Sequence, residues 1–153
     1  MRWPCLLALL LAGCAAAGRE RAVTTSPIFS KGLGVLPPQG PPRAGCALYL
    51  YSAGRGRLLL LAADSSTGTA RIMLDGVVTL LPFIAFDGIP QSGFSRHMSY
   101  GSERAQVALD LDVAGRTDMR GGAAIESGSL RLDRAGADSL ALPVRGLIAC
   151  RAP

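Results

Sequence analysis

The 153-residue chain is poor in the side chains from which catalytic and metal sites are usually built. It has one histidine, four cysteines and no Cys-x-x-Cys pair, so we expect no metal site. No Gly-x-Ser-x-Gly nucleophile elbow is present. Ser95 and His97 are two positions apart, which on a strand puts both on one face without aiming the imidazole at the hydroxyl. Asp110 and Asp112 share a polar strand face, and nothing marks the apolar pocket that glycosidase chemistry needs. We therefore expect neither an enzyme nor a cofactor.

The chain also lacks an apolar run long enough to span a bilayer, which takes about 20 residues. Its apolar stretch, residues 6–11, follows Arg2 and precedes small residues, which is the layout of a secretory signal. The tetrapeptide Leu11-Ala12-Gly13-Cys14 resembles the lipobox of bacterial lipoproteins. The resemblance implies cleavage after residue 13 and acylation of Cys14, which would anchor the protein in a membrane of the cell envelope. Because Ala15 follows the cysteine instead of an aspartate, the resemblance favours the outer membrane, facing the periplasm. An ordinary signal peptide is the alternative.

Aromatic residues make up 5% of the chain, and the basic ones are fifteen arginines and one lysine. The net charge of +5 becomes +4 when residues 1–13 are removed, because they hold Arg2 alone. No stripe of aromatic and basic side chains is present, so we expect no contact with nucleic acid. The arginines are interleaved with aspartates, which favours solvated strand faces over contact with an anionic envelope polymer.

Two cysteines remain once the signal is removed and Cys14 is acylated. Cys46 opens the first strand-like segment, and Cys150 lies near the end of the chain. An even pair in an exported chain is a disulfide candidate, and this bond would join the two ends of one domain. Its role would be structural.

Residues 14–44 are rich in proline and glycine, and their apolar residues are too sparse to form a core. Proline lacks the donor that a ladder of hydrogen bonds needs, so we expect a lipidated, flexible, disordered tether. In the alternative interpretation, Ile28 and Phe29 pack onto the domain as an edge segment.

Residues 45–153 form one domain with a β pattern throughout. Apolar and polar residues alternate over ten positions from Arg104 to Val113, which predicts a strand. Asp75-Gly76 predicts a hairpin turn, and Gly146 breaks the alternation of the last strand and suggests a bulge or bend. Further strands are expected at residues 47–52, 58–63, 70–74, 77–81, 129–133 and 140–144. We predict an all-β fold, a small antiparallel meander of about 7–8 strands that forms a barrel or a sandwich.

Residues 82–103 are the least strand-like part of the domain. A long irregular connection in a compact domain is often functional, and Arg96, His97 and Tyr100 are the contact residues that we expect there. The alternative is a hairpin that closes one end of the barrel with its aromatic rings in the core.

These features favour a non-enzymatic accessory or assembly protein that binds another envelope component through a sheet edge or through residues 82–103. The alternative is a small-ligand-binding or inhibitor module. In size, anchoring and β pattern the chain is similar to the small disulfide-bonded β-barrel lipoproteins that inhibit lysozyme. Tyr51-Ser52-Ala53-Gly54 and Ser99-Tyr100-Gly101 resemble the loop that this family inserts into lysozyme. Such an inhibitor would meet a basic target, and the positive net charge would oppose that encounter.

Overall fold

The structure is a computed structural model that describes residues 32–54, 56–114 and 121–151. The predicted signal peptide, Cys14, and Ile28 and Phe29 lie outside the described residues. No helix within the described ranges is long and apolar enough to cross a membrane.

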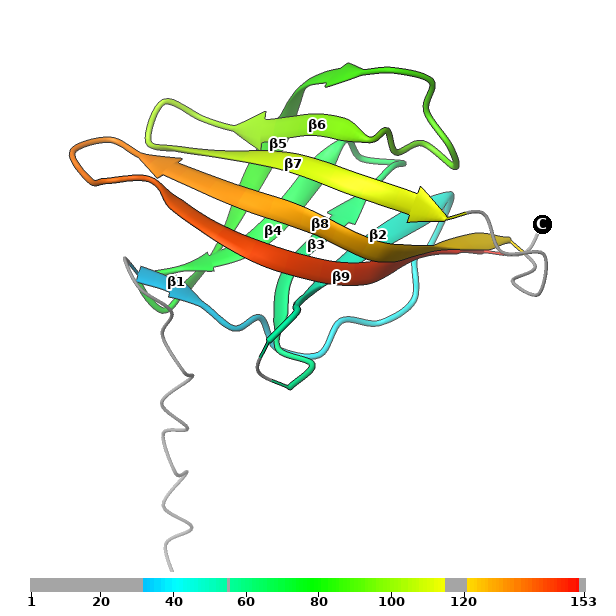
Figure 1. The fold of residues 1–153 in the computed structure, drawn as a ribbon, viewed down its shortest axis with the longest axis horizontal. Coiled ribbons are helices and arrows are strands. Elements are labelled where there is room, and N and C mark those ends of the chain that lie inside the picture. The colour runs from blue at the N-terminus through cyan, green and yellow to red at the C-terminus, as the bar shows by residue number, and fades with distance from the viewer. Residues whose placement is uncertain (1–31, 55, 115–120, 152–153) are drawn as a thin grey trace, which may run out of the picture.

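The described chain folds into an eight-stranded antiparallel barrel with one additional short strand (Figure 1). Each of β2 to β9 pairs with its neighbours along the chain, and β2 also pairs with β9, which closes the barrel. The prediction of a small all-β meander is confirmed. Because the sheet closes on itself, the fold is a barrel and not a sandwich. The strands are β1 (Leu33–Gly34), β2 (Cys46–Ser52), β3 (Leu59–Asp64), β4 (Thr69–Leu74), β5 (Val77–Asp87), β6 (His97–Gly101), β7 (Ala105–Ala114), β8 (Gly122–Arg134) and β9 (Leu140–Cys150).

Alternating side chains explain why these segments are strands. In β7, Val107, Leu109 and Leu111 point into the barrel and are buried, whereas the residues between them face outward. The β4–β5 hairpin turns at Asp75-Gly76, as predicted, and both residues have positive φ angles, 49° and 82°. A two-residue turn with both φ angles positive matches the twist of the strands that it joins.

The barrel interior is filled by one contiguous cluster of apolar side chains that come from all eight barrel strands. Leu48, Leu60, Ile72, Leu130 and Ile148 are among its members and are each 0% exposed. An eight-stranded barrel is just wide enough for side chains to fill it.

The prediction of a flexible tether is wrong for residues 32–44. β1 pairs with β4 through Leu33 and Gly34, and the chain then crosses the outside of β3 and β2 as a strap, defined here as residues 35–44. Leu36 of the strap is 3% exposed and packs in a second apolar cluster with Tyr49 and Leu59. This packing explains the continuous apolar run of β3. The core covers one face of the strand, and the strap covers the other.

The predicted disulfide between Cys46 and Cys150 is present and joins β2 to β9 at the closing seam of the barrel. Gly146 of β9 lies opposite Leu50 on the same seam. The irregularity that we expected near Gly146 is a bulge of β8, between Ile125 and Gly128, and β9 itself continues through this point. A Cβ atom at Gly146 would lie 2.1 Å from the carbonyl oxygen of Tyr49, so the strands meet too closely there for a side chain.

Candidate functional site

The segment that we predicted to be irregular, residues 82–103, contains the end of β5 and all of β6. β5 continues through Pro82 to Asp87, and β6 begins at His97, so the connection between them is residues 88–96. Proline was the misleading signal. Pro82 is the last residue of β5 that pairs with β4, and a register shift follows it between Phe83 and Ala85. A residue without an N–H is tolerated at such a change of partner.

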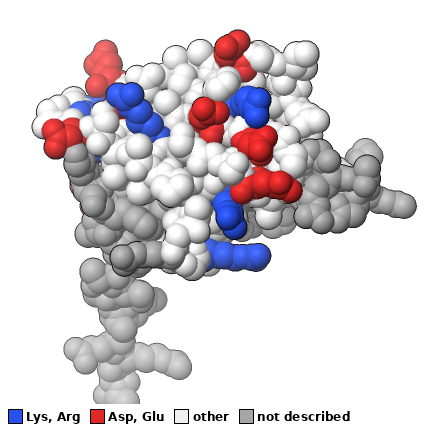
Figure 2. Space-filling model, in the orientation of Figure 1, with Lys and Arg blue, Asp and Glu red and all other residues white. Residues whose placement is uncertain are grey.

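The structure places Arg96 and His97 on the outer wall, each beside an aspartate of β7. An Arg96 nitrogen lies 3.2 Å from Asp112 Oδ1, and His97 Nδ1 lies 3.4 Å from Asp110 Oδ1. All four side chains are more than half exposed. Figure 2 shows acidic and basic side chains intermingled on the face that carries β7, β8 and β9. This face is a solvated surface of mixed charge.

Tyr100 does not join Arg96 and His97, because it points to the other side of its strand. It is 3% exposed, and the edge of its ring meets the ring of Phe83 at a centroid distance of 5.7 Å. Burial raises the pKa of the Tyr100 hydroxyl to about 12. Phe94 is 1% exposed in the same core. Phe94 and Tyr100 are therefore buried in the core, as the alternative expected of the aromatic rings, whereas Phe83 and Phe86 of the same segment are exposed.

Ser95, two residues before the histidine, makes a structural hydrogen bond. Ser95 is 2% exposed, and its hydroxyl donates to the backbone oxygen of Asp87. Across the described residues, no group of three or more His, Cys, Asp or Glu side chains is arranged to hold a metal ion.

The sequence analysis missed the apolar surface of β5. All seven large hydrophobic side chains that are exposed in the described part of the chain belong to this strand and to the turn that follows it. Only Leu81 of the 11 residues of β5 is buried, and no charged residue precedes Asp87 at its end. The exposed residues are Val77, Val78, Leu80, Phe83, Ile84, Phe86 and Ile89, which we call the β5 surface. An uncharged run of ten residues was the available sequence signal, and a proline in its middle concealed it.

β5 also has an open edge. Residues 77–82 pair with β4, and residues 83–87 pair with β6. Within the described chain, the first half of the strand therefore has a strand partner on one side alone. An exposed apolar strand with an unpaired edge is a template onto which another chain can add as a strand.

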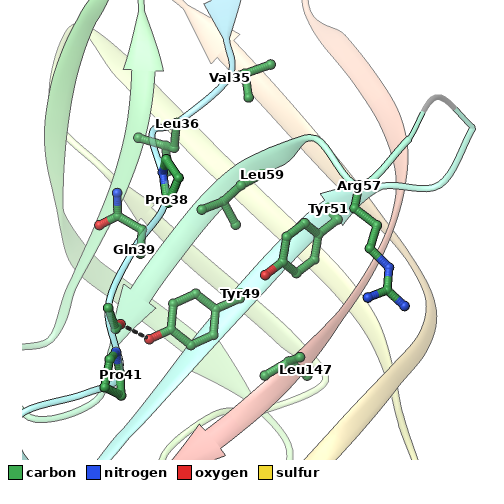
Figure 3. A pocket seen from close by; sticks show the side chains of 11 residues that line it. Val35, Leu36, Pro38, Gln39, Pro41, Tyr49, Tyr51, Arg57, Leu59 and Leu147 are labelled. Carbon is green, nitrogen blue, oxygen red and sulfur yellow. Dashed lines mark hydrogen bonds between the residues drawn. The ribbon is translucent and has the colours of Figure 1, made fainter.

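A second feature of the outer wall is a groove of about 530 Å³ between the strap and the barrel, which we call the strap groove (Figure 3). The strap forms one side, and outward side chains of β2, β3 and β9 form the floor. The Tyr49 hydroxyl donates to the carbonyl oxygen of Gly40 at 2.6 Å and fixes the strap to β2. The groove is lined by Val35, Leu36, Pro38, Gln39, Gly40, Pro41, Tyr49, Tyr51, Arg57, Leu59 and Leu147.

The exposed β5 surface and the strap groove are two features of the outer wall that the sequence analysis did not predict. Comparison of the chain with protein-family models, with curated proteins and with solved structures found no match.

Proposed function

We propose that this protein is a non-enzymatic accessory module of the bacterial envelope, anchored to the outer membrane through an acylated Cys14. Its barrel binds an extended apolar segment of another envelope protein along β5. The anchor rests on the lipobox resemblance of Leu11-Ala12-Gly13-Cys14.

The observation that carries the binding function is the concentration of exposed large hydrophobics on β5, a strand with an open edge along residues 77–82. Leu80 is 62% exposed and Ile84 is 49% exposed. Single exposed hydrophobics are ordinary, but several of them gathered on one strand are typical of an interaction site. The absence of charge from Val77 to Phe86 favours an apolar partner over an anionic polymer.

Strand addition accounts for both properties of β5 together. The unpaired backbone along residues 77–82 would supply main-chain hydrogen bonds to an added strand, and the outward side chains Val78 and Leu80 would supply apolar contact. The mixed charges on the β7–β9 face keep that face solvated.

The test is affinity capture from envelope extracts, with the parent protein and a Leu80→Lys/Ile84→Lys variant as baits. Ala141→Lys is the matched control, because Ala141 is exposed on the outer face of β9 and makes no part of the β5 surface. We expect a specific envelope protein on the parent and on the control, and its loss from the double variant. Equal recovery on all three baits, or no specific protein on any of them, contradicts the proposal.

A further inference from the structure

The strap groove is lined mainly by apolar side chains, and Arg57 at one end is the charged residue of its lining. Its apolar length is formed by Leu36, Leu59 and Leu147 together with the prolines of the strap. The ring of Tyr51 and the side chain of Arg57 stand beside each other at one end (Figure 3).

Two of the polar side chains that line the groove, Tyr49 and Gln39, are already engaged within the protein. The Tyr49 hydroxyl donates to Gly40, and the Gln39 amide nitrogen donates to the carbonyl oxygen of Pro37 at 2.8 Å. By contrast, the Tyr51 hydroxyl and the Arg57 guanidinium have no hydrogen-bond or ion-pair partner within the described residues. The side-chain donors that remain for a ligand are therefore the Tyr51 hydroxyl, which points toward Tyr49, and the Arg57 guanidinium at one end of the groove (Figure 3).

The charge at this end is basic. No acidic residue lines the strap groove. An adjoining hollow of about 820 Å³ shares Tyr51, Arg57 and Leu147 with it and adds a second arginine, Arg145, together with Glu126. Arg145 lies directly opposite Tyr51 in the β2–β9 pairing, so two arginines flank this tyrosine. Glu126 makes no ion pair with either arginine in the described structure.

We propose that the strap groove binds an anionic amphiphile, that is, an apolar chain with a carboxylate or phosphate head group. The apolar chain lies beside the strap, on the outer wall formed by β2 and β3, and the head group accepts hydrogen bonds from the Arg57 guanidinium. A guanidinium suits both head groups, because its planar fork matches the oxygens of a carboxylate or a phosphate. An extended peptide fits less well, since it needs polar partners along its whole length. This inference does not depend on the binding of a protein at β5.

The experiment is calorimetric titration and amide NMR of the full chain carrying Cys14→Ser, so that no acyl group of its own competes. The probes are decanoate and decyl phosphate, each below its micelle concentration. Decanol tests the chain without a charge, and acetate and inorganic phosphate test the head groups without a chain. Decanoate and decyl phosphate also distinguish the two head groups, and binding of either supports the proposal.

We expect chemical-shift changes at Tyr51, Leu59 and Leu147, and about a tenfold loss of affinity in Arg57→Gln, which removes a charged hydrogen bond. Arg104→Gln is the matched control, because Arg104 is an exposed arginine in the β6–β7 turn, outside the groove lining. Leu80→Lys, on β5, should also bind normally.

The proposal is overturned if neither amphiphile binds, if decanol or the free head groups bind as tightly, or if Arg57→Gln binds like the parent. Loss of binding in Leu80→Lys would place the amphiphile on β5 and would likewise overturn it.

Discussion

Cys46 and Cys150 face each other in register across the β2–β9 seam, with Cα atoms 3.9 Å apart although 104 positions separate them in the chain. Their disulfide joins the first barrel strand to the last at the seam that closes the meander. Because a cross-link removes conformational freedom from the unfolded chain, its contribution grows with the length of the loop that it closes.

The double substitution Cys46→Ser/Cys150→Ser should lower the free energy of unfolding by up to about 4–5 kcal/mol. Denaturant unfolding of parent and variant measures the difference. The parent unfolded in the presence of a reductant is the control, and its stability should fall to that of the variant. An unchanged unfolding midpoint in the variant would show that the bond does not stabilise the barrel.

Gly146 should be intolerant of a side chain, because a Cβ there would lie 2.1 Å from the Tyr49 oxygen and 3.0 Å from a Leu50 methyl carbon. We expect Gly146→Ala to destabilise the barrel by about 1–3 kcal/mol, the usual cost of overpacking. Gly54→Ala is the control: a Cβ at Gly54 meets nothing within 4 Å, and the change should stay within about 0.5 kcal/mol. Thermal unfolding of both variants tests the expectation, and equal midpoints would refute the close approach.

Tyr100 should make the stability of the barrel depend on pH in the alkaline range. Burial raises its pKa from 10.0 to about 12, so below pH 10 the hydroxyl is protonated in both the folded and the unfolded chain. Between pH 10 and 12 the unfolded chain releases this proton while the folded chain retains it. Stability therefore falls as pH rises, by about 2–3 kcal/mol over the whole window.

Denaturant unfolding at several pH values between 9 and about 12 measures this slope. The slope should be shallower in Tyr100→Phe, whose ring keeps the packing against Phe83 without a titrating hydroxyl. Parallel curves for parent and variant would show that Tyr100 titrates alike in both states.

The strands with a regular pattern were predictable from the sequence, because alternation reports directly on which side of a strand is buried. β7 and the Asp75-Gly76 hairpin were predicted in this way. β5 was predicted only as far as residue 81, and β6 was not predicted, because Pro82 suggests an end where the strand in fact changes partner from β4 to β6. The exposure of the β5 side chains depends on which strands lie beside β5. The local sequence pattern does not show which strands these are.

The strap groove also could not be predicted from the local sequence pattern. Pro37 and Pro38 lack the N–H groups that sheet pairing requires, so the segment was interpreted as a tether. Proline rings can still pack on an apolar wall without pairing in it. Tyr49, Leu59 and Leu147, which receive the strap, come from three strands that the chain order alone does not bring together.

The membrane anchor leads to a fractionation experiment. Cys14→Ser should move the protein from the membrane pellet to the soluble fraction, because the acylated residue is lost. Cys5→Ser is the matched control, since Cys5 lies in the predicted signal and should be removed with it. Retention of the Cys14→Ser protein in the pellet would contradict acylation at this residue as the cause of anchoring.

The binding of a partner along β5 is the central claim, and photo-crosslinking in intact cells tests it most directly. A photoreactive phenylalanine derivative at position 80, on the exposed face of β5, is compared with the same group at position 141, on β9. The account predicts an adduct with a specific envelope protein from position 80 and none from position 141. The same adducts from both positions, or no adduct from position 80, would contradict it.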